Sequence, residues 1–242
     1  MYRKTLRSKP HHPGFRRGTI EGNIFSIKAY DGTMTAHHLQ GSLFDQTEEL
    51  RLGPLAGIRR TTLGAGAWID VLPGWLRGAD ALFDDLVDRV PWHGERRQMY
   101  ERLVDVPRLL SFYDEADVLP HPVLTQAREA LSAHYRDELR EPFTTAGMCF
   151  YRDGRDSVAW HGDTIGRSST QDTLVAIVSL GEARRLSLRP RTGGPSISFP
   201  VGHGDLLVMG GSCQRTWEHA VLKTARPVGP RISIQFRPHN VR

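Results

Sequence analysis

Two histidines and an aspartate are the residues of this chain whose types and spacing indicate chemistry most directly. His161 and Asp163 are separated by a single glycine, and His219 follows later in the chain. Side chains at positions i and i+2 of a strand share a face, so His161 and Asp163 could bind one ion together. Two histidines and one carboxylate form the facial triad of non-haem iron(II) oxygenases, which leaves positions open for a cosubstrate and dioxygen. Taken alone, these residues leave open the alternative of ordinary core or surface histidines.

A second chemical signal lies near the C-terminus, where apolar and polar side chains alternate strictly along residues 231–237. This pattern predicts a strand with one apolar and one polar face. The polar face consists of Arg231, Ser233, Gln235 and Arg237. One interpretation is an edge strand with a solvated polar face. The other is the inner wall of a barrel-like sheet that holds a polar ligand, where an arginine suits a dicarboxylate. Tyr151, two residues after Cys149, could add a hydroxyl.

The elements that must position these residues are short strands that recur after residue 142. The predicted strands span 143–151, 173–180, 184–189, 195–200, 204–209, 213–217 and 231–237. Many short strands at this spacing indicate a sandwich or jelly roll. We therefore predict an α+β, mainly β fold in which residues 142–242 form a double-stranded β-helix, or jelly-roll, core.

The segment before this core has a helical pattern in place of the short strands. Two amphipathic helices are predicted at 76–90 and 122–140, with an extended segment at 106–113 between them. We expect residues 41–141 to be a helical support and lid for the core, so that 41–242 form a single domain. Residues 1–40 are rich in glycine, histidine and basic residues without an apolar period, and are expected to be a basic, disordered tail.

Charge is distributed unevenly along the chain, whose formal net charge is +5. Residues 1–20 contain six Lys/Arg and no acid, and residues 183–242 contain ten Lys/Arg against Asp205 and Glu218. Such regions can attract a polyanion by counterion release. A solvated basic face without a partner is the alternative.

Several classes of protein are disfavoured by composition. No apolar run approaches the length of a membrane span, and no apolar stretch follows the basic N-terminus as in a secretory signal. Two cysteines, Cys149 and Cys213, cannot form a disulfide framework and suit a reducing cytoplasm. We therefore expect a cytoplasmic protein without membrane contact, and both cysteines can be read as small buried core residues.

Taken together, the motifs resemble the AlkB-like 2-oxoglutarate/Fe(II) dioxygenases, which remove alkyl groups from bases. The resemblance runs from about Trp92 to Arg237. It rests on Val106-Pro107-Arg108 with Tyr113, Tyr151-Arg152-Asp153-Gly154, Trp160-His161-Gly162-Asp163, Val178-Ser179-Leu180-Gly181, Gly204-Asp205-Leu206-Leu207-Val208-Met209, Gln214, Trp217-Glu218-His219, Arg231 and Phe236-Arg237.

The resemblance implies a role for each matching residue. His161, Asp163 and His219 would bind Fe(II), and O2 would be the oxidant. Arg231 and Tyr151 would bind the distal carboxylate of the cosubstrate 2-oxoglutarate, and Arg237 would organise Asp163 near the iron. Cys149 and Ser233 stand in the cosubstrate pocket where many members carry asparagine, which removes amide hydrogen bonds.

The substrate implied by the resemblance is an N-alkylated base in nucleic acid, either single-stranded or flipped out of a duplex. Arg108 and Tyr113 match a lid over this base, and Trp160 is assigned to the same substrate site. Thr164 replaces an acid that often follows the H-x-D motif, so the preferred base stays open, as does DNA versus RNA. We expect a monomer. The alternatives are a dioxygenase of small molecules or proteins, and a non-enzymatic cupin-type binding protein.

Overall fold

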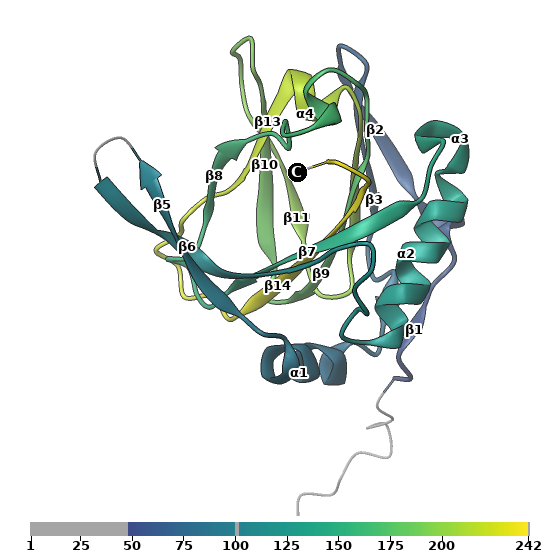
Figure 1. The fold of residues 1–242 in the computed structure, drawn as a ribbon, viewed down its shortest axis with the longest axis vertical. Coiled ribbons are helices and arrows are strands. Elements are labelled where there is room, and N and C mark those ends of the chain that lie inside the picture. The colour runs from purple at the N-terminus through teal and green to yellow at the C-terminus, as the bar shows by residue number, and fades with distance from the viewer. Residues whose placement is uncertain (1–47, 100–101, 242) are drawn as a thin grey trace, which may run out of the picture. The chain divides into compact units, whose positions relative to one another are not determined.

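The structure, a computed structural model, describes residues 48–99 and 102–241 (Figure 1). The predicted tail, residues 1–40, therefore lies outside the described residues. Helices occupy a small part of the described chain. They are α1 (Asp80–Arg89), α2 (Pro122–His134), α3 (Arg136–Leu139) and α4 (Cys213–Thr216), with the 3-10 turns η1 (Leu55–Gly57) and η2 (Arg167–Ser169). None of these helices is long and apolar enough to cross a membrane.

Antiparallel sheets contain more of the described residues than the helices do. The major sheet has eight strands in the order β2 (Arg59–Gly64), β3 (Ala67–Leu72), β12 (Leu206–Gly211), β9 (Val175–Gly181), β14 (Arg231–Pro238), β7 (Phe143–Tyr151), β6 (Arg102–Tyr113) and β5 (His93–Met99). The minor sheet has four, in the order β11 (Ile197–Val201), β10 (Arg184–Pro190), β13 (Trp217–Val221) and β8 (Val158–His161). A two-stranded ribbon joins β1 (Arg51–Leu52) to β4 (Leu76–Arg77). This is the predicted mainly β jelly roll.

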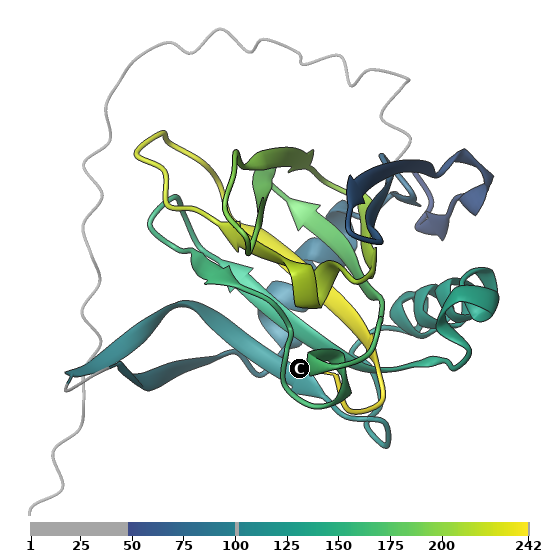
Figure 2. The ribbon, with the colours of Figure 1, turned by 90° about the horizontal axis from the view of Figure 1, so that it is seen from above.

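Two apolar layers hold the fold together. One lies between the two sheets, where Ile177 and Leu207 of the major sheet pack with Leu186 and Leu188 of the minor sheet. The other covers the outer face of the major sheet with α1 and α2. Figure 1 shows these helices outside the sheets, and Figure 2 shows the β5–β6 hairpin extending from the side away from α2.

The alternation of residues 231–237 separates an apolar face from a polar face that lines a pocket, as in the second of the two interpretations. Ile232, Ile234 and Phe236 are fully buried in the outer apolar layer. Arg231, Ser233, Gln235 and Arg237 line a pocket between the sheets instead. The strand is central in the major sheet, paired with β7 and β9, so the edge-strand interpretation is wrong.

Two predicted elements are wrong at their boundaries. The helix expected at 76–90 begins only at Asp80, because Leu76 and Arg77 pair with β1 and Gly78 takes a φ of 63° that no helix continues through. The helix expected at 122–140 is interrupted at Tyr135, with α2 ending at His134 and the short α3 beginning at Arg136.

The strand predicted at 213–217 is also wrong. Residues Cys213–Thr216 form the single helical turn α4, and the strand begins at Trp217. The Thr216 hydroxyl donates to the Ser212 carbonyl at 3.0 Å, and the Thr216 amide donates to the same oxygen at 2.9 Å, which closes the turn. The shift places His219 in the middle of β13 rather than after a strand.

Candidate metal centre and adjoining pocket

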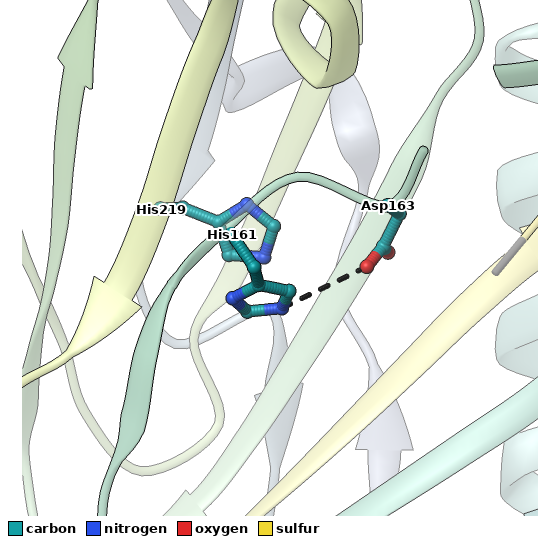
Figure 3. Close-up of side chains that lie close together, drawn as sticks. All are labelled: His161, Asp163 and His219. Atoms are coloured by element: carbon teal, nitrogen blue, oxygen red, sulfur yellow. Dashed lines mark ion pairs between the residues drawn. The ribbon is translucent and has the colours of Figure 1, made fainter. Parts of the chain in front are cut away.

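Three potential metal ligands converge at one end of the minor sheet (Figure 3). His161 is the last residue of β8, and His219 lies opposite it on β13. Their rings are 4.2 Å apart between centroids. Asp163 follows His161 by two residues, and one potential ligand atom from each of the three side chains lies within 4.8 Å of the other two. The structure thus brings the predicted triad together.

The reason for this convergence differs from the predicted one. The strand β8 ends at His161, so Asp163 does not share a strand face with it. The chain turns instead, with the Thr164 amide donating to the Gly162 carbonyl at 2.8 Å and the Asp163 amide donating to Gln214 Oε1 at 2.9 Å. A Cβ atom on Gly162 would lie 2.4 Å from the Gln214 carbonyl oxygen, so the tight turn requires glycine.

A bulge in β8 helps to aim His161. His161 pairs with His219 and Val158 pairs with Val221, so β8 has one more residue than β13 between the two pairs. Such bulges re-aim side chains near functional sites. As a result, both Val158 and His161 line the pocket.

Hydrogen bonds fix the orientation of the ligand side chains. His161 Nδ1 lies 2.8 Å from the Ala159 carbonyl, which assigns the proton to Nδ1 and leaves Nε2 facing Asp163 Oδ1 at 3.8 Å. Arg237 Nε donates to the other carboxylate oxygen, Oδ2, at 2.7 Å. Asp163 therefore presents Oδ1 toward the histidines.

The electrostatics of the cluster favour the protonation states that bind metal. Burial alone would raise the pKa of Asp163, but the charges of Arg237 and the two histidines outweigh it and bring the pKa to about 2. Burial, together with the neighbouring His161, lowers the pKa of His219 to about 3. Near neutral pH Asp163 is thus a carboxylate and His219 a neutral imidazole, the forms that coordinate a cation.

The adjoining pocket contains an arginine suited to an anionic ligand. Arg231 is only 2% exposed, and its Nε donates to Ser179 Oγ at 2.9 Å. Its Nη1 is buried and has no hydrogen-bond partner among the side chains that the structure describes. Burial lowers the pKa of Arg231. A buried cation with an open donor fits the carboxylate of a dicarboxylic acid.

Tyr151 lines the pocket next to Arg231. The two residues are cross-strand neighbours, and the Arg231 guanidinium carbon lies 5.4 Å from the centre of the Tyr151 ring. Burial raises the pKa of Tyr151, so its hydroxyl stays protonated and can donate.

Two further positions complete the floor of the pocket, Cys149 on β7 and its cross-strand partner Ser233 on β14. The Gln235 amide donates to Ser233 Oγ at 2.6 Å, and Cys149 Sγ lies 3.8 Å from Gln235 Oε1. Gln235 thus connects the two positions. Cys149 is only partly buried, whereas Cys213 is the small buried core residue expected for both.

The predicted substrate residues do not all reach the pocket. Arg108 lines it and donates to the Ser157 carbonyl at 3.1 Å. Tyr113 packs against the outer apolar layer. It is five residues from Arg108 on β6, and since side chains alternate between the two faces of a strand, the two residues lie on opposite faces. Phe112, 42% exposed, points to the same face as Arg108.

Trp160 also lies elsewhere than predicted. The Arg189 guanidinium stacks on its ring at 4.5 Å and pairs with Glu218 at 2.7 Å. Arg189 is next to the buried Leu188 on β10, so this cluster occupies the outer face of the minor sheet. The assignment of Trp160 to the substrate site is not supported by this position.

Two contacts of the site had no assigned role in the sequence analysis. Gln214 holds the Asp163 amide, and Ser179 holds Arg231. Both belong to matched motifs, but neither alternation nor spacing marks them, since β9 is buried on both faces and α4 is a single turn.

Comparison with known proteins agrees with this geometry. The sequence profile of the 2OG-Fe(II) oxygenase superfamily matches residues 111–237. Alpha-ketoglutarate-dependent dioxygenase alkB homolog 3 of Homo sapiens is 27% identical over 208 residues, covering 78% of this chain and 69% of that protein. The Mus musculus protein of the same name is 28% identical over 205 residues, with the same coverage.

A more distant relative and one solved structure extend the comparison. DNA oxidative demethylase ALKBH2 of Homo sapiens is 25% identical over 179 residues, covering 66% of this chain and 68% of that protein. The structure of OsALKBH1 has a TM-score of 0.52 at 15% identity, covering 75% of this chain and 100% of that one, which shows a shared fold. The chain belongs to the 2OG-Fe(II) oxygenase superfamily, as an AlkB-like dioxygenase that uses iron(II), 2-oxoglutarate and dioxygen.

Proposed function

We propose that this dioxygenase removes alkyl groups oxidatively from N-alkylated bases in nucleic acid, with DNA as the first substrate to test. The observation that carries the proposal is similarity over most of the chain to alkB homolog 3 and to a protein named DNA oxidative demethylase. The non-enzymatic cupin-type alternative is wrong, because the family is a family of oxygenases.

Different residues of the pocket would bind the metal and the cosubstrate in this reaction. When bound, iron(II), 2-oxoglutarate and dioxygen supply the oxidising power that hydroxylates the alkyl carbon next to nitrogen, after which the alkyl group leaves as an aldehyde. His161, Asp163 and His219 would hold the metal, and Arg237 would keep Asp163 oriented toward it. Arg231 and Tyr151 would hold the distal carboxylate of the cosubstrate.

A base must leave the duplex stack, or be single-stranded, before it can react in an enzyme pocket. Arg108 and Phe112 lie on the pocket face of β6, where a cation and an exposed aromatic ring suit a nucleotide. The sequence of the β5–β6 hairpin adds arginines at positions 96, 97 and 102. The basic balance of residues 183–242 favours a polyanionic substrate over a neutral one.

The direct test is mass spectrometry of methylated oligonucleotides after incubation with enzyme, iron(II) and 2-oxoglutarate. Single- and double-stranded DNA and RNA oligonucleotides carrying 1-methyladenine or 3-methylcytosine form the substrate panel, and His219→Ala is the control. We expect the oligonucleotides to lose the mass of the methyl group with the wild-type enzyme and to keep it with His219→Ala.

A second outcome would favour a small-molecule or protein substrate. Residues 21–242 taken by themselves carry a net charge of −1, which suits such a substrate. Succinate formed without nucleic acid, unchanged when every methylated oligonucleotide is added, would contradict the nucleic-acid proposal while leaving the dioxygenase assignment in place.

A further inference from the structure

Gly147 occupies a position in the pocket wall where a side chain would be expected. It is buried in the middle of β7, between Phe112 of β6 and Gln235 of β14. It shares a strand face with Cys149 and Tyr151, both of which line the pocket. A side chain at this position would therefore point to the pocket face of the sheet.

The backbone at this position does not itself require glycine. Gly147 lies in a regular strand and is absent from the residues of the described chain that have a positive φ. Glycine inside a strand commonly marks a place where another group approaches closely. The reason for glycine here is therefore to be found in what fills the space beside it.

That space is filled by Arg237 and Gln235. A Cβ atom on residue 147 would lie 2.8 Å from Arg237 Nη1 and 3.3 Å from Gln235 Oε1. Gln235 is tied to Ser233 by its amide, at 2.6 Å to the hydroxyl and 3.0 Å to the carbonyl. The group that would have to move is therefore the end of the Arg237 side chain.

Movement of Arg237 would act directly on a metal ligand. Its Nε donates to Asp163 Oδ2 at 2.7 Å, and the Asp163 side chain is nearly buried. The guanidinium is rigid and planar, so a rotation about the Cδ–Nε bond that withdraws Nη1 also turns the Nε–H bond away from Asp163 Oδ2. Loss of a group that hydrogen-bonds to a metal ligand commonly lowers metal affinity about 10–100-fold.

We propose that Gly147 is a positioning residue of the metal centre. By lacking a side chain it leaves the space from which Arg237 holds Asp163 with Oδ1 toward His161 and His219. Gln235 closes the other side of this space, so Gly147 and Gln235 form a complementary cross-strand pair. This role does not depend on the identity of the substrate.

The test compares Mn(II) affinity, measured by electron paramagnetic resonance in the absence of oxygen, for wild type and Gly147→Ala. The matched control is Gly94→Ala, a strand glycine of β5 where an added Cβ meets nothing within 4 Å. We expect at least a fivefold loss of Mn(II) affinity in Gly147→Ala and unchanged affinity in Gly94→Ala. A smaller loss in Gly147→Ala would overturn the proposal.

A double-mutant cycle with Arg237→Met shows whether Gly147 acts through the arginine. In the Arg237→Met background, Gly147→Ala should change Mn(II) affinity less than twofold. A loss as large as in the wild-type background would contradict the proposal. If Gly147→Ala alone does not fold, recovery of a cooperative melting transition in the double variant would identify Arg237 as the clashing group. Failure to recover would place the requirement in the backbone packing instead.

Discussion

Arg231 shows how much a single side chain determines in this pocket. It is a nearly inaccessible cation whose Nη1 has no hydrogen-bond partner within the described part of the chain. Its neighbours are Tyr151, whose hydroxyl is protonated, and Ser179, which accepts a hydrogen bond from Arg231 Nε. A buried charge of this kind is unfavourable until a counter-ion arrives. We therefore propose that Arg231 gives the pocket its selectivity for a dicarboxylate, separately from metal binding.

Replacing Arg231 by leucine should raise the 2-oxoglutarate requirement at least a hundredfold. The physical reason is the loss of one partner of a buried charge pair, which costs on the order of 3–5 kcal/mol. The measurement is the KM for 2-oxoglutarate in a succinate assay, with Mn(II) affinity as the control that should stay constant. A change in KM of less than fivefold would show that another cation holds the cosubstrate.

Phe112 and Tyr113 give a second test at the scale of residues. Tyr113 packs against the apolar layer, so Tyr113→Ala should lower stability by about 3 kcal/mol, measured by urea unfolding. Phe112 is exposed on the pocket face, so Phe112→Ala should leave stability within about 0.5 kcal/mol. Phe112→Ala should also reduce turnover of methylated oligonucleotide without abolishing succinate formation. The reverse pattern would place Tyr113 at the substrate.

At the scale of elements, a buried carboxylate adds a polar contact between the helical segment of α2 and α3 and the major sheet, beside their apolar packing. Asp70 on β3 accepts from the Tyr135 hydroxyl at 2.9 Å and from Arg60 through two bonds of 2.8 Å. Tyr135 is fully buried between α2 and α3 and stacks with Trp68 at 6.1 Å. Tyr135 stands four residues after the buried Leu131, so its ring lies on the same inward face of the helical segment and reaches Asp70.

Asp70→Ala should therefore destabilise the protein by about 2–3 kcal/mol, because it leaves a buried hydroxyl without its acceptor. Tyr135→Phe should cost about 1 kcal/mol, since Asp70 keeps its bonds to Arg60. Urea unfolding gives both values. Asp85→Asn, which breaks a surface pair with Arg89, is the control and should cost less than about 0.5 kcal/mol. Equal effects for Asp70 and Asp85 would mean that the buried network does not fasten the helices.

The elements also show which features the sequence could predict. The strand β14 was predictable because the alternation of its apolar and polar side chains reflects two different environments, the outer apolar layer and the pocket. The helical turn α4 was not, because a single turn has no period and depends on hydrogen bonds to Ser212. The orientation of Tyr113 was predictable in principle, since odd spacing from Arg108 places the two on opposite faces.

The predicted metal and cosubstrate residues lie together in the site, whereas Tyr113 and Trp160 lie away from it, and part of the geometry could not be predicted. The motifs indicated His161, Asp163, His219 and Arg231 together. The turn that redirects Asp163 depends on Gln214, a residue distant in sequence, and no local pattern reports such a contact. The same is true of the space beside Gly147, which exists only once β7 and β14 are paired.

At the scale of the whole molecule, charge and catalysis are expected to be separable. Residues 1–20 contribute six Lys/Arg without an acid, while the metal centre and pocket lie between residues 108 and 237. Deleting residues 1–33 should leave methyl removal from short oligonucleotides intact and weaken non-specific binding. Each lost phosphate contact should reduce the slope of log affinity against log salt by about 0.7–0.9. An unchanged slope, or loss of the thermal transition, would contradict this expectation.

We propose that His161, Asp163 and His219 hold the metal on which turnover depends. The most direct measurement is iron-dependent succinate formation by wild type, His161→Ala and His219→Ala, with iron content determined on the same samples. We expect each variant to keep a cooperative thermal transition, to bind far less iron and to form no succinate above background. Near wild-type succinate formation in either variant, with one iron still bound per chain, would contradict it.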